Sequence, residues 1–420
     1  MTEVDSTLEP SQIPEEERTP EQQPGDSDRW RDALTRIFGG NIMLSVLAIV
    51  IALVVGGILI AATDPATDAA SAYFFARPTT ALADAWNAVS GAYAALFRGG
   101  VYDYTQTSFV AGVKPIFNSL NFAAPLIAAG LGIAIGFRTG VFNIGGQGQI
   151  LIAAAFAGWV GFSLHLPYGI HLIVAVAAAL VGGGIWAGIV GVLKTRTGAH
   201  EVIVTIMLNY VAYYLIDYLL HTPVLRAPGS QNPQSPATLP TAVYPNLFGS
   251  SLPLNLGFVF TVAATVFTWW LLNRSSLGFK FRAVGENMRA AKVAGINTDR
   301  VFIVAMVLSG VFVGLAGAYQ VLAQTTTGFG NDIDAGIGFN AITVTLLGRS
   351  RPWGVFWSGI LFGVFQAGGY IMQASQNVDI DIVTVVQSVI VLFIAAPPLV
   401  RAIFRLPQPG ARRAVKGANA

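Results

Sequence analysis

The chain has 420 residues, of which 54% are hydrophobic and only 11% are charged, and its mean hydropathy is +0.60. A soluble globular domain carries about 25% charged residues, so this chain has too few polar side chains to cover its surface in water. The composition therefore excludes an ordinary soluble fold and predicts an integral membrane protein. The sequence contains no cysteine, which excludes a disulfide scaffold, a thiolate metal site and a cysteine nucleophile.

The two ends of the chain differ from the rest. Residues 1–28 are rich in Glu, Asp, Pro, Gln and Ser, and such a segment cannot bury enough apolar surface to order itself. We therefore expect residues 1–36 to form a disordered acidic tail rather than a secretory signal. Residues 406–420 form a basic tail, in which three side chains can contact anionic lipid headgroups: Arg412, Arg413 and Lys416.

Residues 37–405 are expected to form a transmembrane domain. The stretch Ile42–Ala62 is apolar and long enough to span about 30 Å of hydrocarbon. Further spans are expected at roughly 116–137, 145–164, 170–193, 202–220, 253–272, 301–322, 336–348, 354–373 and 382–400. The eighth of these is the shortest. The sequence thus predicts an all-α polytopic membrane protein with about ten transmembrane helices.

The positions of lysine and arginine orient these spans. Cytoplasmic loops carry an excess of both residues, and Arg29, Arg31 and Arg36 precede the first span. With the N-terminus inside and ten spans, all but four of the 24 basic residues fall on the cytoplasmic side. The exceptions lie in the long outer segments 63–115 and 221–252: Arg77, Arg98, Lys114 and Arg226. Both termini are therefore expected in the cytoplasm, with an interfacial helix around Asp84–Phe97.

The sequence shows no energy source of its own. It contains no Gly-x-x-x-x-Gly-Lys-Ser/Thr motif and no Gly-Lys pair, so it has no loop to hold the phosphates of ATP. The expected spans are also almost free of charge, whereas ion-driven carriers place charged groups inside them. Glu201 and Asp217 lie at the two ends of the fifth span, where a carboxylate is commonly solvated. An ion-coupled secondary carrier and a non-transporting scaffold remain as alternatives.

Enzyme activity has little support. His200 and Glu201 begin like a zinc-binding motif, but Val204 stands where the second histidine would be. No Gly-x-Ser-x-Gly sequence occurs. We therefore predict no catalytic residue, no metal site and no enzyme activity, and nothing in the sequence indicates a nucleic-acid partner.

The cytoplasmic segment between the sixth and seventh spans, residues 273–300, is unusual. It carries six basic residues: Arg274, Lys280, Arg282, Arg289, Lys292 and Arg300. A short helix is expected over Glu286–Ala294, with Gly295 ending it and with Ala290, Ala291 and Ala294 forming a small-residue face. Such a face could dock into a groove on a soluble partner. An ordinary basic cytoplasmic loop explains the same residues equally well.

The stretch Arg282–Gly295 resembles the coupling loop of the permeases of ATP-binding-cassette (ABC) importers. Arg289-Ala290-Ala291-x-x-x-Gly295 is similar to their Glu-Ala-Ala-x-x-x-Gly motif, with Arg289 in place of the glutamate. Three further stretches resemble the nucleoside and simple-sugar branch of these permeases: Phe137–Gln149, Glu201–Tyr210 and Gly336–Arg349. The four matches together cover about residues 110–400.

The resemblance implies a fold and a set of partners. The fold would be similar to that of the vitamin B12 importer permeases, with about ten helices. Such a permease pairs with a second permease, usually a different chain in the nucleoside branch. Two cytoplasmic ATPases, which use ATP and Mg, bind the coupling helices, and an extracytoplasmic lipoprotein delivers the solute. The chain itself would bind no cofactor. The residues carried over as ATPase-coupling are Arg282, Gly285, Glu286, Ala290, Ala291 and Gly295.

The resemblance also favours a nucleoside as the solute. Phe-Asn-Ile-Gly at 142–145, with Asn143 where sugar permeases commonly have Asp, is similar to nucleoside permeases. A glycine-broken turn here could present an aromatic face and neutral amides to a path. The expected pathway residues are Phe142, Asn143, Gln147, Gln149, Asn209 and Asn340. The alternatives are that these amides only satisfy backbone groups or link helices, and that the solute is a simple sugar such as ribose.

Overall fold

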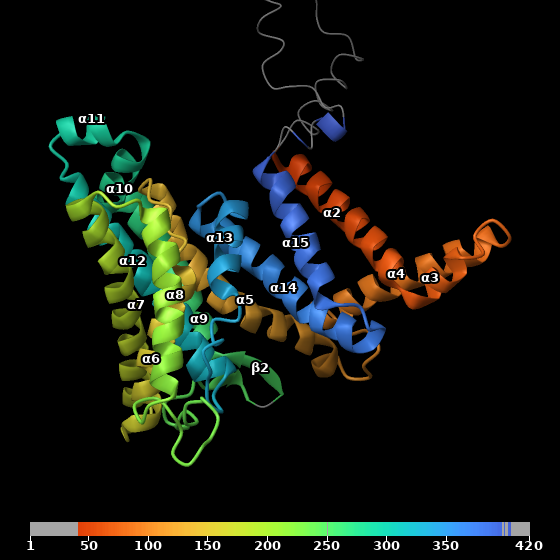
Figure 1. The fold of residues 1–420 in the computed structure, drawn as a ribbon, viewed down its shortest axis with the longest axis horizontal. Helices are drawn as coiled ribbons and strands as arrows, with labels where there is room; N and C mark the ends of the chain where they lie inside the picture. Colours follow the sequence, from red (N-terminus) through yellow and green to blue (C-terminus); the bar gives the residue numbers. More distant parts are fainter. Residues whose placement is uncertain (1–40, 250, 397–398, 400–401, 405–420) are drawn as a thin grey trace, which may run out of the picture. The chain divides into compact units, whose positions relative to one another are not determined.

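The computed structural model describes residues 41–396, except residue 250, together with residue 399 and residues 402–404. The chain divides into two compact units, one of Met1–Leu47 with Pro397–Ala420 and one of Ala48–Ala396. The expected acidic tail 1–36 and basic tail 406–420 lie outside the described residues. The arrangement that follows is that of Ala48–Ala396 (Figure 1).

Helices make up nearly every element of the described chain. In chain order they are α2 (Asn41–Thr63), α3 (Pro65–Ser71), α4 (Pro78–Gly100), α5 (Phe109–Arg138), α6 (Gly146–Ser163), α7 (Ile170–Thr197), α8 (Glu201–Leu220), α9 (Leu256–Arg274), α10 (Ser276–Glu286), α11 (Met288–Val293), α12 (Thr298–Tyr319), α13 (Ile337–Leu347), α14 (Pro352–Gln376) and α15 (Ile380–Ala395). A π-helical turn, Gln320–Gln324, extends α12. One antiparallel hairpin, β1 (Asn246–Phe248) and β2 (Leu252–Asn255), precedes α9.

Each apolar stretch expected to span the membrane forms a helix, but the helices differ in length. Six of those in the described chain are long and apolar enough to cross a membrane, namely α5, α7, α8, α9, α12 with its π-helical turn, and α14. The count rises to seven if α2 and α3, which meet at a bend of 73°, form one span. The fold is therefore an all-α polytopic membrane protein, whereas the expected count of ten is not confirmed.

Helix α13 shows why the count falls short. Its 11 residues rise about 16 Å at 1.5 Å per residue, roughly half of the hydrocarbon thickness. The preceding residues 325–336 are not helical. The stretch expected as an eighth span, 336–348, is therefore a half-length helix preceded by irregular backbone.

Helix α12 occupies the centre of the helix packing. Glycines let α7 approach it backbone to backbone, because a Cβ atom on Gly183 or Gly310 would collide with the other helix. Gly132 of α5 meets the backbone of Ser309 on the other side of α12 in the same way. Small residues at these positions let the helix backbones approach closely, as is common between membrane helices.

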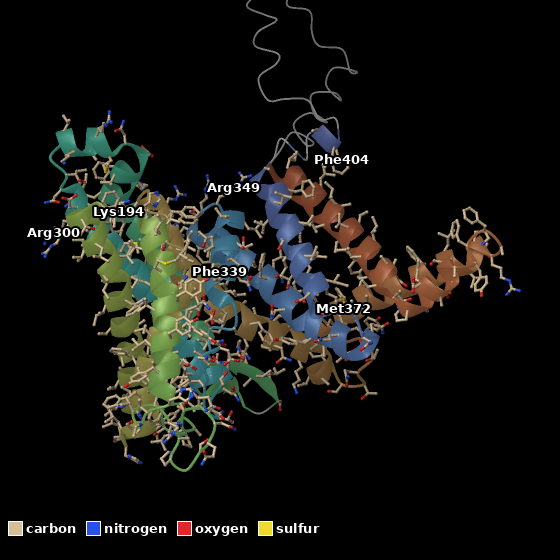
Figure 2. The ribbon with its side chains drawn as sticks, in the orientation of Figure 1. Lys194, Arg300, Phe339, Arg349, Met372 and Phe404 are labelled. Carbon is tan, nitrogen blue, oxygen red and sulfur yellow. The ribbon has the colours of Figure 1, made fainter. Side chains whose placement is uncertain are left out.

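The connections gather at two ends of the helices. In Figure 1, α10 and α11 lie together at one end, and the loop 221–252 with its hairpin lies at the other. Figure 2 shows Lys194, Arg300 and Arg349 near the end that carries α10 and α11. The helix expected around Asp84–Phe97 is longer than predicted: it is α4, which packs along α14 through Gly99 and Gly368.

Candidate functional site

Two helices begin inside the bundle, and their N-termini meet there. Helix α6 starts at Gly146 after the non-helical stretch 139–145, and α13 starts at Ile337. A Cβ atom on Gly146 would lie 2.9 Å from the carbonyl oxygen of Gly338, so the two helix starts touch through their backbones. This contact is called the helix junction below.

The helix junction lies at about half the depth of the bundle. Asn143, which precedes α6, donates from Nδ2 to Oγ of Ser309 over 2.9 Å. Ser309 stands near the middle of α12, a helix long enough to cross the membrane. Helices that begin at mid-depth are typical of transporters, because their free N–H groups need polar partners or a water-filled path.

Three of the expected pathway amides form hydrogen bonds around the non-helical stretch that precedes α6. Asn143 and Gln149 are buried and bond each other, and Asn143 Oδ1 also accepts from the N–H of Gly145 over 2.9 Å. Asn209 accepts from the N–H of Gly148 and donates to the carbonyl of Ile144. Asn143 and Asn209 thus satisfy backbone groups that the non-helical stretch leaves free, which is one alternative that the sequence left open, whereas Gln149 bonds the side chain of Asn143.

Two other expected residues keep accessible polar groups at the helix junction. Gln147, on the first turn of α6, is partly exposed and donates to Asp334 Oδ1 over 3.5 Å. Asn340, on the first turn of α13, is also partly exposed, and its amide nitrogen lies beside Gly336. The second carboxylate oxygen of Asp334 accepts from the N–H of Gly336. The junction thus combines two amides and one carboxylate.

Asp334 is the charged group that the sequence analysis missed. Its side chain is 5% exposed, and it forms no ion pair within the described part of the chain. The N-termini of α6 and α13 offer partial positive charge to this carboxylate. The pattern Asp332-x-Asp334 directly before Gly336-x-Gly338 could have indicated it, since an aspartate side chain commonly bonds the backbone N–H two residues on in a turn.

Two aromatic side chains are exposed near the helix junction. Phe142 is 41% exposed and stacks on Phe137, with ring centroids 4.6 Å apart. Phe339 is 50% exposed on the first turn of α13, and Figure 2 shows it away from the end marked by Arg349. Phe339 was not predicted, because a phenylalanine in an apolar stretch carries no signal of its exposure.

The expected coupling segment forms two short helices instead of one. Helix α10 ends at Glu286, and α11 runs from Met288 to Val293. Asn287 starts α11 by accepting from the N–H of Ala290 over 3.0 Å. Gly295 ends it with a φ of 81°, as expected, and Ile296 N donates back to the carbonyl of Ala291.

The side of α11 that faces outward differs from the expected alanine face. Ala291 is 4% exposed and packs into the core, because the turn at Asn287 rotates it toward α10 and α12. Ala290 and Ala294 remain exposed. Val293 is 91% exposed and Met288 49%, so the surface available to a partner combines the apolar Met288, Ala290, Val293 and Ala294 with the basic Arg289 and Lys292. Ala291 is corrected to a packing residue.

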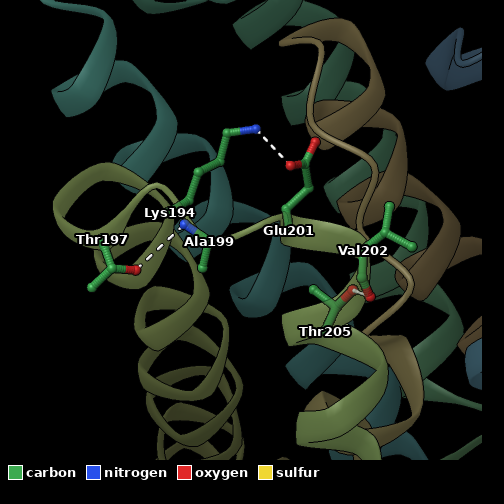
Figure 3. A network of polar contacts seen from close by, with 6 residues as sticks. All are labelled: Lys194, Thr197, Ala199, Glu201, Val202 and Thr205. Carbon is green, nitrogen blue, oxygen red and sulfur yellow. Dashed lines mark hydrogen bonds and ion pairs between the residues drawn. The ribbon is translucent and has the colours of Figure 1, made fainter.

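A single ion pair closes the turn between α7 and α8. Lys194 Nζ lies 2.8 Å from Glu201 Oε2 (Figure 3), and the same ammonium group lies 4.9 Å from the ring centroid of Phe302 on α12. Figure 3 also shows Thr197, which accepts from the N–H of Ala199 in that turn. Glu201, which the sequence placed as a solvated carboxylate at a helix end, is paired.

Comparison with known proteins now decides the family. The profile described as "Branched-chain amino acid transport system / permease component" matches residues 115–395. The chain belongs to this family. The match covers both the helix junction and the coupling segment, whereas α2, α3 and α4 precede it.

The permease is similar to several curated relatives. It is 32% identical to the guanosine ABC transporter permease protein NupP of Bacillus subtilis, over 77% of this chain and 90% of the relative. It is 30% identical to the nucleoside ABC transporter permease protein NupB of Lactococcus lactis, over 76% and 88%. It is 34% identical to the glucose ABC transporter permease protein TsgB13 of Haloferax volcanii, over 65% and 73%. No solved structure matches.

These matches make the chain a multi-pass permease subunit of an ABC transporter. As a permease it is a transport component rather than an enzyme, and it works with ATPase subunits and a solute-binding protein. The resemblance stated from the sequence is thereby confirmed at the level of the family.

Proposed function

We propose that this permease carries a nucleoside past the helix junction. The observation that supports this is the bonded pair Gln147–Asp334 at the helix junction, with the partly exposed Asn340 and the exposed Phe339 on the first turn of α13. Polar side chains at mid-depth are costly against lipid, so they face a water-filled path or another protein surface. Partly exposed amides at this depth, with the buried carboxylate of Asp334 bonded to one of them, therefore favour a solute path.

The chemistry of the helix junction suits a nucleoside. A base is a flat π-system that stacks on an aromatic ring, with about 1–3 kcal/mol lost when such a ring is replaced by alanine. The amides of Gln147 and Asn340 can both donate and accept, as the edges of a base require. The carboxylate of Asp334 can accept from the hydroxyls of ribose. Two of the relatives carry guanosine or nucleosides by name.

A simple sugar is the second candidate, because one relative is a glucose permease. Sugar hydroxyls can use the same amides and carboxylate. A sugar lacks the flat base, however, so it depends less on stacking with Phe339. The two candidates therefore predict different effects of Phe339→Leu.

For the architecture we infer ten crossings in the bacterial inner membrane, with a fold similar to the vitamin B12 importer permeases and both termini in the cytoplasm. Residues 325–336 with α13 count as one crossing, and α2, α6 and α15 count as crossings too. In this topology the end that carries α10 and α11 is cytoplasmic. The basic side chains Lys194, Arg300 and Arg349 near that end support the orientation.

The partners follow from the same proposal. Two ATPase subunits, which bind ATP and Mg, would contact α11 and its neighbours Arg282, Gly285, Glu286 and Gly295. A second permease of different sequence would complete the path, and an extracytoplasmic lipoprotein would supply the solute. The exposed Met288 and Val293 on α11, flanked by basic residues, support a docked partner because apolar residues rimmed by polar ones mark interaction sites.

Uptake measurements test the solute. A strain lacking this gene would be complemented with the wild-type chain, and uptake of radiolabelled guanosine, uridine, ribose and glucose would be measured. The proposal expects nucleoside uptake that excess unlabelled nucleoside, but not excess glucose, suppresses. Sugar uptake insensitive to nucleosides would establish the second candidate. Uptake by the purified chain alone, driven by an ion gradient without ATP, would contradict the ATPase coupling.

A further inference from the structure

A basic cavity of about 680 Å³ lies between α5, α9, α10 and α14. It is separate from the helix junction, and no residue of the junction lines it. Its walls combine cationic and aromatic side chains: Arg138, Arg282 and Arg351 with Trp269, Trp353 and Trp357. The cavity is called the Arg–Trp pocket below.

The three arginines give the pocket an uncompensated positive charge. No carboxylate lines the pocket, and none of the three guanidinium groups forms an ion pair within the described residues. All three guanidinium groups carry the same charge around one cavity, and the exposed Glu286 at the end of α10 does not line it. Like charges gathered around one cavity are costly unless an anion joins them.

Hydrogen bonds hold two of these arginines at the wall. Arg138 Nε donates to the carbonyl oxygen of Ser350 over 3.0 Å, and Arg282 donates to the carbonyl of Leu272. A guanidinium group has five N–H donors, so each keeps donors for a ligand. Arginine donors in such a fork match the oxygens of a phosphate.

The tryptophans indicate where this phosphate comes from. Trp357 is 64% exposed, Trp353 42% and Trp269 39%, which is unusual for so large an apolar side chain. Trp269 stands near the end of α9, a helix that is long and apolar enough to span the membrane. Tryptophans of this kind gather at the level of the lipid headgroups.

We propose that the Arg–Trp pocket binds the phosphate of an anionic phospholipid, with the acyl chains along the aromatic surface of α9 and α14. Free inorganic phosphate would offer the same group to the three arginines as a phospholipid does. The exposed tryptophans favour the phospholipid. Because Arg282 belongs to α10, an occupied pocket ties the coupling segment to the membrane surface. The assignment to the cytoplasmic leaflet rests on the proposed orientation, whereas the binding itself does not.

Native mass spectrometry of the purified full-length chain tests the proposal. Phosphatidylglycerol and phosphatidylcholine would be titrated separately, and inorganic phosphate would be added as a competitor. The change is Arg351→Gln, and the matched control is Arg349→Gln, an exposed arginine nearby that does not line the pocket. We expect phosphatidylglycerol to bind more tightly than phosphatidylcholine, and R351Q to weaken this binding by about fivefold while R349Q leaves it unchanged.

A second readout does not depend on charge. Phosphatidylglycerol with brominated acyl chains should quench tryptophan fluorescence more than brominated phosphatidylcholine, and Trp357→Phe should reduce this difference. Size-exclusion profiles matching the wild type would show that the variants fold. Equal binding of both lipids, or equal loss in R351Q and R349Q, would overturn the proposal. Complete displacement of phosphatidylglycerol by millimolar inorganic phosphate would assign the pocket to free phosphate instead.

Discussion

Gly140 packs directly against Gly285: a Cβ atom on Gly140 would lie 3.3 Å from the Cα atom of Gly285. The reverse contact is tighter still, because a Cβ atom on Gly285 would collide with the carbonyl of Arg138. Gly285 lies in the last turn of α10, next to the exposed α11, and Gly140 lies in the non-helical stretch 139–145 that leads into α6. This backbone contact connects α10 to the stretch that leads into the helix junction, and we propose that a displacement of α10 would be transmitted through it.

This contact makes Gly285→Ala a test of the coupling route. The added methyl group should push the 138–140 turn and lower ATP-dependent uptake by roughly tenfold, within the range of an ordinary coupling energy, while the chain still inserts in the membrane. The control is Gly229→Ala in the outer loop, where φ is 75° and no atom lies within 4 Å. Equal uptake in the two variants would remove the coupling role from this contact.

Asp334→Asn should weaken solute binding at the helix junction. The carboxylate accepts from Gln147 and from the N–H of Gly336, and a lost charged hydrogen bond costs about 1.5–3 kcal/mol. We therefore expect the apparent KM for nucleoside uptake to rise by roughly ten- to a hundredfold. Asp332→Asn, an exposed neighbour with the same change of charge, serves as the control. An unchanged KM in D334N would exclude Asp334 from the path.

Substitution of a buried amide of the site should lower stability, whereas substitution of an exposed amide should alter uptake. Asn209→Ala leaves the N–H of Gly148 and the carbonyl of Ile144 without partners, which costs about 1–3 kcal/mol in a buried site. Its melting temperature in detergent should fall. Asn340→Ala should leave melting unchanged and alter uptake, because that side chain is partly exposed beside Gly336. The opposite pattern would reverse the two assignments.

This division also shows what the sequence could and could not predict. Apolar runs located the helices, because the membrane demands long apolar stretches. Hydropathy marked 336–348 as the shortest expected span, but it could not show that α13 begins inside the bundle against the start of α6. The sequence does not distinguish Asn143 from Asn340. Only the packing shows that Asn143 is buried and bonds a backbone group, whereas Asn340 stays partly exposed. The inward position of Ala291 was not predicted either, because the sequence did not indicate the break between α10 and α11 at Asn287.

The outward side of α11 can be tested with Val293→Glu. Because the side chain is 91% exposed, a charge there should not disturb folding. It should reduce co-purification of the ATPase subunits, with affinity falling by about fivefold or more if Val293 lies in the contact. Leu247→Glu, on the hairpin before α9, places the same charge at an exposed apolar residue of the outer loop. Loss of the ATPase in both variants would point to general misfolding.

The pair between Lys194 and Glu201 closes the turn between α7 and α8, and a double-mutant cycle can measure it. The side chains are 22% and 14% exposed, with the charged atoms 2.8 Å apart, so the pair is better shielded than an ordinary surface ion pair. We expect Lys194→Met and Glu201→Gln to be coupled by about 1 kcal/mol, measured from thermal unfolding in detergent. The coupling should shrink in high salt. Lys194 also lies over the ring of Phe302, so K194M should cost more than E201Q. If both single variants unfold like the wild type, the turn is held by helix packing alone.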